Sequence, residues 1–172
     1  MLLGQESHIF RTSDLAVLWG IMNKNTLLTT IRRYVQREIL YPIQKGMYAT
    51  IPLNKLHPYE LGCALAGSSS YVSTETVLQT EGIIMQQVQT ITLFGAKAMS
   101  KTVGSGSYLV RYLHPKYLLN RTGIVEKSIY AVASIERAIA DMLYIEPTYY
   151  FDNEKATSAA QVVKLSKEIG YS

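Results

Sequence analysis

Residues between positions 24 and 45 carry side chains that can read and grip duplex DNA. Asn25 can form two hydrogen bonds with an adenine edge, and the methyl groups of Thr26 and Thr29 can pack on thymine methyls. Arg33 can read a guanine or hold a phosphate, and other cations here suit the DNA backbone. The candidate set is Lys24, Asn25, Thr26, Thr29, Arg32, Arg33, Arg37 and Lys45.

An amphipathic helix must position most of this set. From Asn25 to Ile39 the apolar residues recur with helical spacing, and they are Leu27, Ile31, Tyr34 and Val35. Residues 40–50 follow with β-forming side chains around a Gln-Lys-Gly turn, which predicts a hairpin with Lys45 at its tip. There Lys45 can touch a phosphate or enter the minor groove.

Upstream residues predict a second, shorter helix and a strand. Residues 14–20 form an amphipathic segment that Thr12 or Ser13 can cap and Gly20 can end. A tight turn then leads to Asn23 or Asn25 as the next cap. Residues 8–11 alternate in polarity and predict a strand that pairs with the hairpin. This order predicts a winged helix-turn-helix over residues 1–52.

Residues 58–172 predict a second, mixed domain, so the expected fold class is α+β. We expect helices over 59–66, opened by Pro58, over 134–144 and over 153–169, and one that starts in 71–78 with Ser73 as its cap. Strands are expected over 88–94, 101–103 and 108–113 as an antiparallel sheet, with a fourth over 129–133.

Charge is unevenly distributed. The chain has a net charge of +4, and residues 82–125 contain no acid. An anionic partner is therefore plausible. Lys97, Lys101, Arg111 and Lys116 predict either a second nucleic-acid surface or a solvated sheet face, and the sequence favours neither.

Other reactive residues have simpler structural interpretations. Cys63 is the only cysteine and the histidines lack metal-ligand spacing, so we expect no metal site and no cofactor. Glu75 and Glu136 fall in first helical turns, and Asp141 lies one turn after Arg137. We therefore expect no enzyme. No segment has the apolar length of a membrane span, and a cytoplasmic location is expected.

Three blocks in this order resemble one family, the AbiE-type (abortive infection, type IV) antitoxin regulators. KGMYAT at 45–50 is similar to the family's wing-closing pattern, YVSTETVL at 71–78 to its Tyr-Ile/Val-Ser signature, and ASIERAIADMLY at 133–144 to its third block. The family usually has Gly where Glu38 stands and Pro where Ile135 stands.

The resemblance implies an antitoxin that represses its own two-gene operon and counters a nucleotidyltransferase-like toxin, often without a stable complex. It also implies that regulation and neutralisation belong to different domains. One winged module reads few base pairs, so we expect a homodimer on an inverted repeat of double-stranded operator DNA. Two alternatives stay open: a stand-alone regulator without a toxin, and a winged module that binds protein.

Overall fold

The computed structural model describes residues 6–153 and 158–171. The chain divides into two compact units, Met1–Leu61 and Gly62–Ser172, which we call the N-terminal and C-terminal units. Helix α3 (Pro58–Ala66) contains the division. The fold is mixed α and β, consistent with the α+β class.

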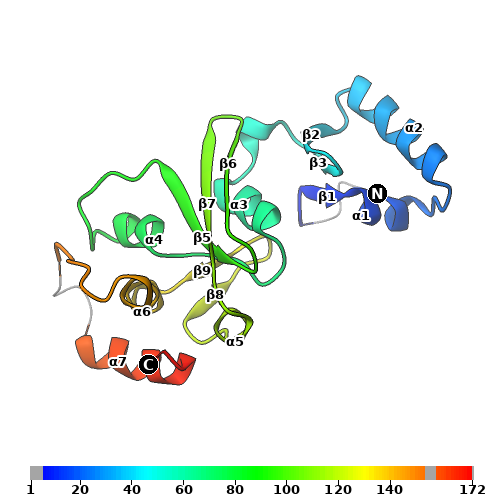
Figure 1. Cartoon of the computed structure of the whole chain (residues 1–172). Helices are drawn as coiled ribbons and strands as arrows, with labels where there is room; N and C mark the ends of the chain where they lie inside the picture. The colour runs from blue at the N-terminus through cyan, green and yellow to red at the C-terminus, as the bar shows by residue number, and fades with distance from the viewer. Residues whose placement is uncertain (1–5, 154–157, 172) are drawn as a thin grey trace. The chain divides into compact units, whose positions relative to one another are not determined.

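The N-terminal unit combines two helices with a small antiparallel sheet of strand order β1-β3-β2 (Figure 1). Its elements are β1 (Ile9–Arg11), α1 (Thr12–Trp19), α2 (Lys24–Gln36), β2 (Tyr41–Gln44), β3 (Met47–Ala49) and the short 3-10 helix η2 (Leu53–Lys55). The predicted hairpin and the strand that pairs with it are confirmed. Phe10 and Leu15 are buried together with Leu27, Ile31 and Leu40, so the apolar arc of α2 does face the core.

The start of α1 differs from the prediction. The helix begins at Thr12, and neither Thr12 nor Ser13 is its N-cap, because Arg11 holds that position. The Asp14 carboxylate instead accepts a hydrogen bond from the Arg11 backbone N–H at 2.7 Å. Gly20 ends the helix in the left-handed region (φ 64°), as predicted.

The end of α2 also differs, since the helix stops at Gln36 and not at Ile39. Glu38 takes a left-handed conformation with φ 55°. The backbone N–H groups of Ile39 and Leu40 then both donate to the Tyr34 carbonyl, at 2.9 and 3.3 Å. The left-handed turn at Glu38 places Leu40 in the core, where it is 1% exposed.

The C-terminal unit is built on a six-stranded sheet of order β6-β7-β5-β4-β9-β8 (Figure 1). Its strands are β4 (Tyr71–Val72), β5 (Thr90–Gly95), β6 (Met99–Val103), β7 (Gly106–Tyr112), β8 (Ile124–Glu126) and β9 (Ala131–Ala133). Its helices after α3 are α4 (Glu75–Thr80), α5 (Pro115–Leu118), α6 (Ile135–Ile145) and α7 (Ala159–Ile169).

This sheet is mixed, so the predicted antiparallel arrangement of its first three strands is wrong. β6 and β7 are antiparallel, but β7 lies beside β5 and runs parallel to it. The reason is burial: Tyr108 and Val110 of β7 are buried, whereas β6 exposes Ser100 and Thr102. The more apolar strand occupies the interior, and the polar strand forms the edge.

Two helix starts were also misplaced. Tyr71 and Val72 form a strand, and Thr74, at φ 51°, is the N-cap residue of α4 in place of Ser73. The last helix begins at Ala159, and the predicted positions 154–157 lie outside the described residues. Among the described residues, no helix combines the length and apolar character needed to cross a membrane.

Candidate nucleic-acid interface

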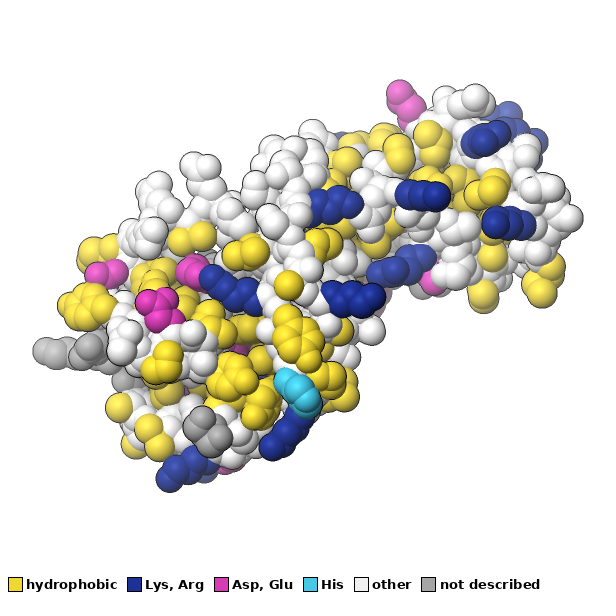
Figure 2. Space-filling model, viewed as in Figure 1, with side chains coloured by type: hydrophobic (Ala, Val, Ile, Leu, Met, Phe, Trp, Pro, Cys, Tyr) yellow, Lys and Arg dark blue, Asp and Glu magenta, His cyan; other side chains and the backbone are white. Residues whose placement is uncertain are grey.

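Helix α2 and the β2–β3 hairpin present all eight residues of the first candidate set to solvent. Each of them is exposed, and by helical spacing those within α2 other than Lys24 lie on the side away from buried Leu27 and Ile31. Figure 2 shows Lys and Arg side chains spread over this region of the N-terminal unit. The structure therefore brings the set together on one unit.

Asn23 fixes the first turn of α2. Its side-chain oxygen accepts from the backbone N–H groups of Asn25 and Thr26, both at 3.0 Å. The Thr26 hydroxyl donates to the same oxygen at 3.3 Å. This cap gives a hydrogen-bond partner to backbone N–H groups that would otherwise have to bind water. It uses the Thr26 hydroxyl but leaves the Asn25 side chain exposed.

The exposed side of α2 forms a stripe along its 13 residues. Asn25, Thr29, Arg32 and Gln36 recur every third or fourth position, which aligns them on one side of a helix. Gln36 was not predicted as a site residue, although it is exposed and one turn after Arg32. Its spacing is the signal that could have identified it. Arg37 is the C-cap residue and lies beyond the last helical position.

The five cations of this set have no acidic partner within the part of the chain that the structure describes. Neither Lys24, Arg32, Arg33, Arg37 nor Lys45 forms an ion pair with another described residue. The described arginines of the C-terminal unit differ, because Arg111, Arg121 and Arg137 each pair with a carboxylate. Unpaired cations on the surface of one unit keep their full charge for an anionic ligand.

Lys45 lies at the tip of the hairpin because Gly46 makes the turn with φ 77°. The Gly46 carbonyl accepts from the Thr12 backbone N–H at 3.0 Å, which ties the tip to the start of α1. The tip is therefore held by the backbone, and the Lys45 side chain is exposed.

The second candidate surface is only partly available. Lys97 and Lys116 are exposed and Lys101 is half-buried. Arg111 is not a free cation, because its guanidinium donates to both carboxylate oxygens of Glu75 at 2.5 Å. It also donates to the Thr74 hydroxyl at 2.9 Å. Burial acts to raise the pKa of Glu75, but hydrogen bonds, chiefly from Arg111, outweigh it and hold that pKa below the ordinary carboxyl value.

A buried polar cluster forms around two side chains of α6. Arg137 and Asp141 are both 0% exposed, with Nε 2.9 Å from the carboxylate. The Asp141 carboxylate also accepts from the Ser73 and Tyr171 hydroxyls at 2.7 and 2.6 Å. The Arg137 guanidinium donates to the Tyr71 hydroxyl at 2.6 Å, and to the carbonyls of residues 120 and 122. The predicted helical pair exists, but it is a core element and not a surface pair.

This cluster holds its groups in fixed protonation states. Burial and the adjacent Asp141 charge raise the pKa of Tyr71 and of Tyr171 far above the ordinary tyrosine value. Burial alone would lower the pKa of Arg137, but the groups that face it, chiefly Asp141 and then Tyr71 and Tyr171, outweigh burial and raise it. A tyrosine that stays neutral and a guanidinium that stays charged exchange no protons near neutral pH. The cluster therefore acts as a structural support.

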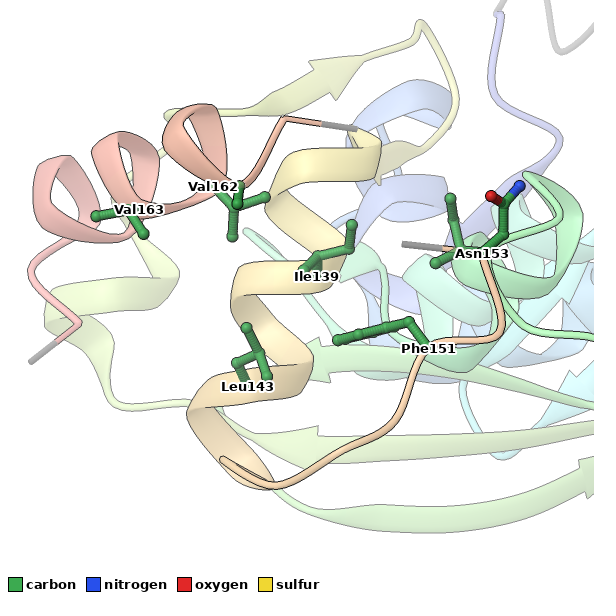
Figure 3. Close-up of a pocket in the computed structure, with 8 residues that line it drawn as sticks. Ile139, Leu143, Phe151, Asn153, Val162 and Val163 are labelled. Carbon is green, nitrogen blue, oxygen red and sulfur yellow. The ribbon is translucent and has the colours of Figure 1, made fainter. Parts of the chain in front are cut away.

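An apolar cavity of about 290 Å³ lies beside α6 and α7 (Figure 3). Ile139 and Leu143 extend from α6, Val162 and Val163 from α7, and Phe151 from the segment after α6. The remaining lining residues are Ile83, Asn153 and Ala159. These residues include no acid, base or nucleophile, so the cavity offers packing surface and no acid–base chemistry.

The described residues contain no cluster of three or more side chains that could hold a metal ion. Cys63 is half-buried, and burial raises the pKa of its thiol, so the thiolate form is disfavoured. No model of a known protein family matches the chain, and no curated protein matches it.

Proposed function

We propose that the N-terminal unit is a winged helix-turn-helix that binds duplex DNA, and that the chain is a transcriptional autorepressor of the AbiE antitoxin type. The observation that carries the proposal is the exposed side of α2. Together with Arg37 at its C-cap and Lys45 on the hairpin, it presents five cations that form no ion pair with another described residue, around amide and hydroxyl side chains. Phosphate contacts and base-edge contacts need that combination.

In this proposal α2 enters the major groove by its N-terminal half. Asn25 and Thr29 meet base edges, and Arg33 meets a guanine or a phosphate. Arg32, Gln36 and Arg37 lie further along and hold the backbone. The hairpin is the wing, with Lys45 on the adjacent phosphates or in the minor groove. Two copies on an inverted repeat double the number of base pairs read.

The antitoxin part rests on the three sequence blocks, and the second of these contains Tyr71 and Ser73 of the buried cluster. In this proposal a neighbouring gene encodes a nucleotidyltransferase-like toxin, and the C-terminal unit counters it in the cytoplasm with or without a stable complex. A reading frame of that kind beside the gene, together with rescue of growth on co-expression, supports the antitoxin role. Its absence leaves a stand-alone regulator.

The DNA-binding part is tested with Arg33→Ala on the fragment upstream of the gene and on a scrambled duplex of equal length. If Arg33 reads a base, the variant weakens binding to the upstream fragment by roughly 1–3 kcal/mol and leaves binding to scrambled DNA nearly unchanged. Lys127→Ala removes an exposed cation of the C-terminal unit and is the matched control. An equal loss on both duplexes makes Arg33 a phosphate contact.

A protein-binding role for the winged module is the second candidate, and apolar side chains favour it. Val17 and Met22 are 82% and 96% exposed, on α1 and in the turn that follows it. Affinity for a protein partner held by such contacts stays nearly constant with ionic strength, whereas affinity for DNA falls steeply. The salt dependence of the partner's binding therefore separates the two.

A further inference from the structure

Three tyrosine rings meet at the surface of the C-terminal unit, and we call Tyr117, Tyr144 and Tyr171 the tyrosine cluster. The Tyr144 and Tyr171 rings are stacked, with centroids 4.3 Å apart and planes 14° apart. The Tyr117 ring meets both edge-on, at 5.4 and 5.1 Å. The rings come from α5, α6 and the residue after α7's glycine cap, so three separate segments converge here.

The buried cluster holds this surface in place. The Tyr171 hydroxyl donates to the Asp141 carboxylate at 2.6 Å, and that carboxylate is fully buried. Tyr171 is thereby fixed, and its ring supports one side of Tyr144. Tyr144 nevertheless remains 41% exposed, and its hydroxyl has no hydrogen bond to another described residue. An exposed ring that is already immobilised loses little conformational entropy when a flat ligand stacks on it.

Basic side chains border the tyrosine cluster. Lys116 is exposed, its Nζ lies 5.4 Å from the centre of the Tyr117 ring, and it forms no ion pair with a described residue. The exposed His114 ring lies 6.1 Å from the Tyr117 ring, and its Nδ1 accepts from the Lys116 backbone N–H, which leaves Nε2–H as the hydrogen-bond donor of the ring. Both residues fall in the acid-free stretch 82–125. Figure 2 shows hydrophobic side chains gathered on this face of the C-terminal unit, with a histidine and a basic side chain beside them.

We propose that the tyrosine cluster, with Lys116 and His114, is a binding site for a single-stranded polynucleotide, separate from the duplex site on α2. One base stacks on the outer side of the Tyr144 ring. Its phosphates lie toward Lys116 and His114. Rigid aromatic rings beside an unpaired cation, here Lys116, are an arrangement that binds single strands without sequence preference, because every base has a π face and every linkage a charge. An apolar protein segment would use the rings but not the cation.

The test is fluorescence polarisation of the full chain with labelled 12-mers of uridylate and of thymidylate, at low and high salt. The strands lack self-structure, and the pair separates RNA from DNA. Tyr144→Ala is expected to weaken binding about 5- to 150-fold, the range for loss of one stacked base. Tyr144→Phe keeps the ring and is expected to bind within about twofold of the wild type. Lys116→Ala is expected to weaken binding and to lower the salt slope by about 0.7.

Two matched controls isolate the site. Tyr150→Ala removes a tyrosine that is 73% exposed and outside the tyrosine cluster, and Arg33→Ala weakens the duplex site. Both are expected to bind the single strands like the wild type. The proposal is overturned if the wild type binds neither strand, if Tyr144→Ala binds as tightly as Tyr144→Phe, or if Tyr150→Ala loses as much affinity. Thermal unfolding of Tyr144→Phe and Tyr144→Ala shows whether any loss reflects misfolding. None of these outcomes depends on duplex binding by α2.

Discussion

Asp141→Asn is the substitution that best tests the interior of the C-terminal unit. It keeps the size of the side chain but removes the carboxylate charge that faces the Arg137 guanidinium at 2.9 Å, in a place where both side chains are 0% exposed. The Ser73 and Tyr171 hydroxyls also lose a charged acceptor. Removing one partner of such a buried pair costs about 3–5 kcal/mol, because the remaining charge cannot return to water.

An ion pair with the same i,i+4 spacing on an exposed helix surface stabilises a protein much less, and α7 contains such a pair. Lys164 and Glu168 form an i,i+4 pair at 3.9 Å on α7, with side chains 79% and 48% exposed. Glu168→Gln is expected to cost no more than about 0.5 kcal/mol. The two variants remove ion pairs of equal spacing, so the difference between their losses in free energy of unfolding reports the effect of burial.

Urea unfolding measures both costs. Far-UV circular dichroism follows the whole chain, whereas fluorescence of Trp19, the only tryptophan, follows the N-terminal unit, where its ring packs against Tyr34 at 5.0 Å. Asp141→Asn is expected to lower the stability of the C-terminal unit and to leave the Trp19 transition in place. A loss below about 1 kcal/mol would refute the assignment of this pair as a buried support.

Three further substitutions test local features. Glu38→Gly removes a side chain from a left-handed position at φ 55°, so it is expected to stabilise the N-terminal unit by about 1 kcal/mol, and an unchanged Trp19 transition in urea would contradict this. Asn23→Ala removes the cap of α2 and is expected to cost about 1 kcal/mol in the same assay, whereas Asn23→Ser should recover most of it. Glu75→Gln tests the pH dependence of stability. Because folding lowers the pKa of Glu75, the ionised carboxylate stabilises the folded chain above the ordinary carboxyl pKa of about 4.5, and this stabilisation is lost as the pH falls below that value. The variant is therefore expected to lose less stability than the wild type on acidification, and equal losses would contradict the role given to Arg111.

Local features of the N-terminal unit could be predicted because local signals determine them. Gly46 marks the hairpin turn, Asn23 caps α2, and the spacing of Leu27 and Ile31 defines the buried side. The end of α2 was missed because Glu38 adopts a conformation that sequence rules reserve for Gly or Asn. The burial of Leu40 requires the left-handed turn at Glu38, and burial in the core is a tertiary effect.

The C-terminal unit was harder to predict because its order depends on distant contacts. Nothing local shows that β7 inserts between β5 and β6, since strand order follows from which strand buries more apolar surface. Ser73 lies where the sequence predicts a helix cap, yet its hydroxyl donates to the carboxylate of Asp141, 68 positions away. The sequence predicts Arg111 as a surface cation, because Glu75 lies 36 positions away and only the fold brings the two side chains together. The short elements β4, α5 and β8 gave no periodic signal of their own.

The measurement that tests the proposed function most directly is binding of the purified protein to the DNA upstream of its own gene, beside a scrambled duplex of equal length, at about 50 and 200 mM salt. The proposal predicts tighter binding to the upstream fragment. It also predicts a fall in affinity with salt of up to roughly 500-fold per protomer, if all five cations of the α2 site contact phosphate. Equal binding to the two duplexes, or affinity that does not change with salt, would contradict a sequence-specific repressor.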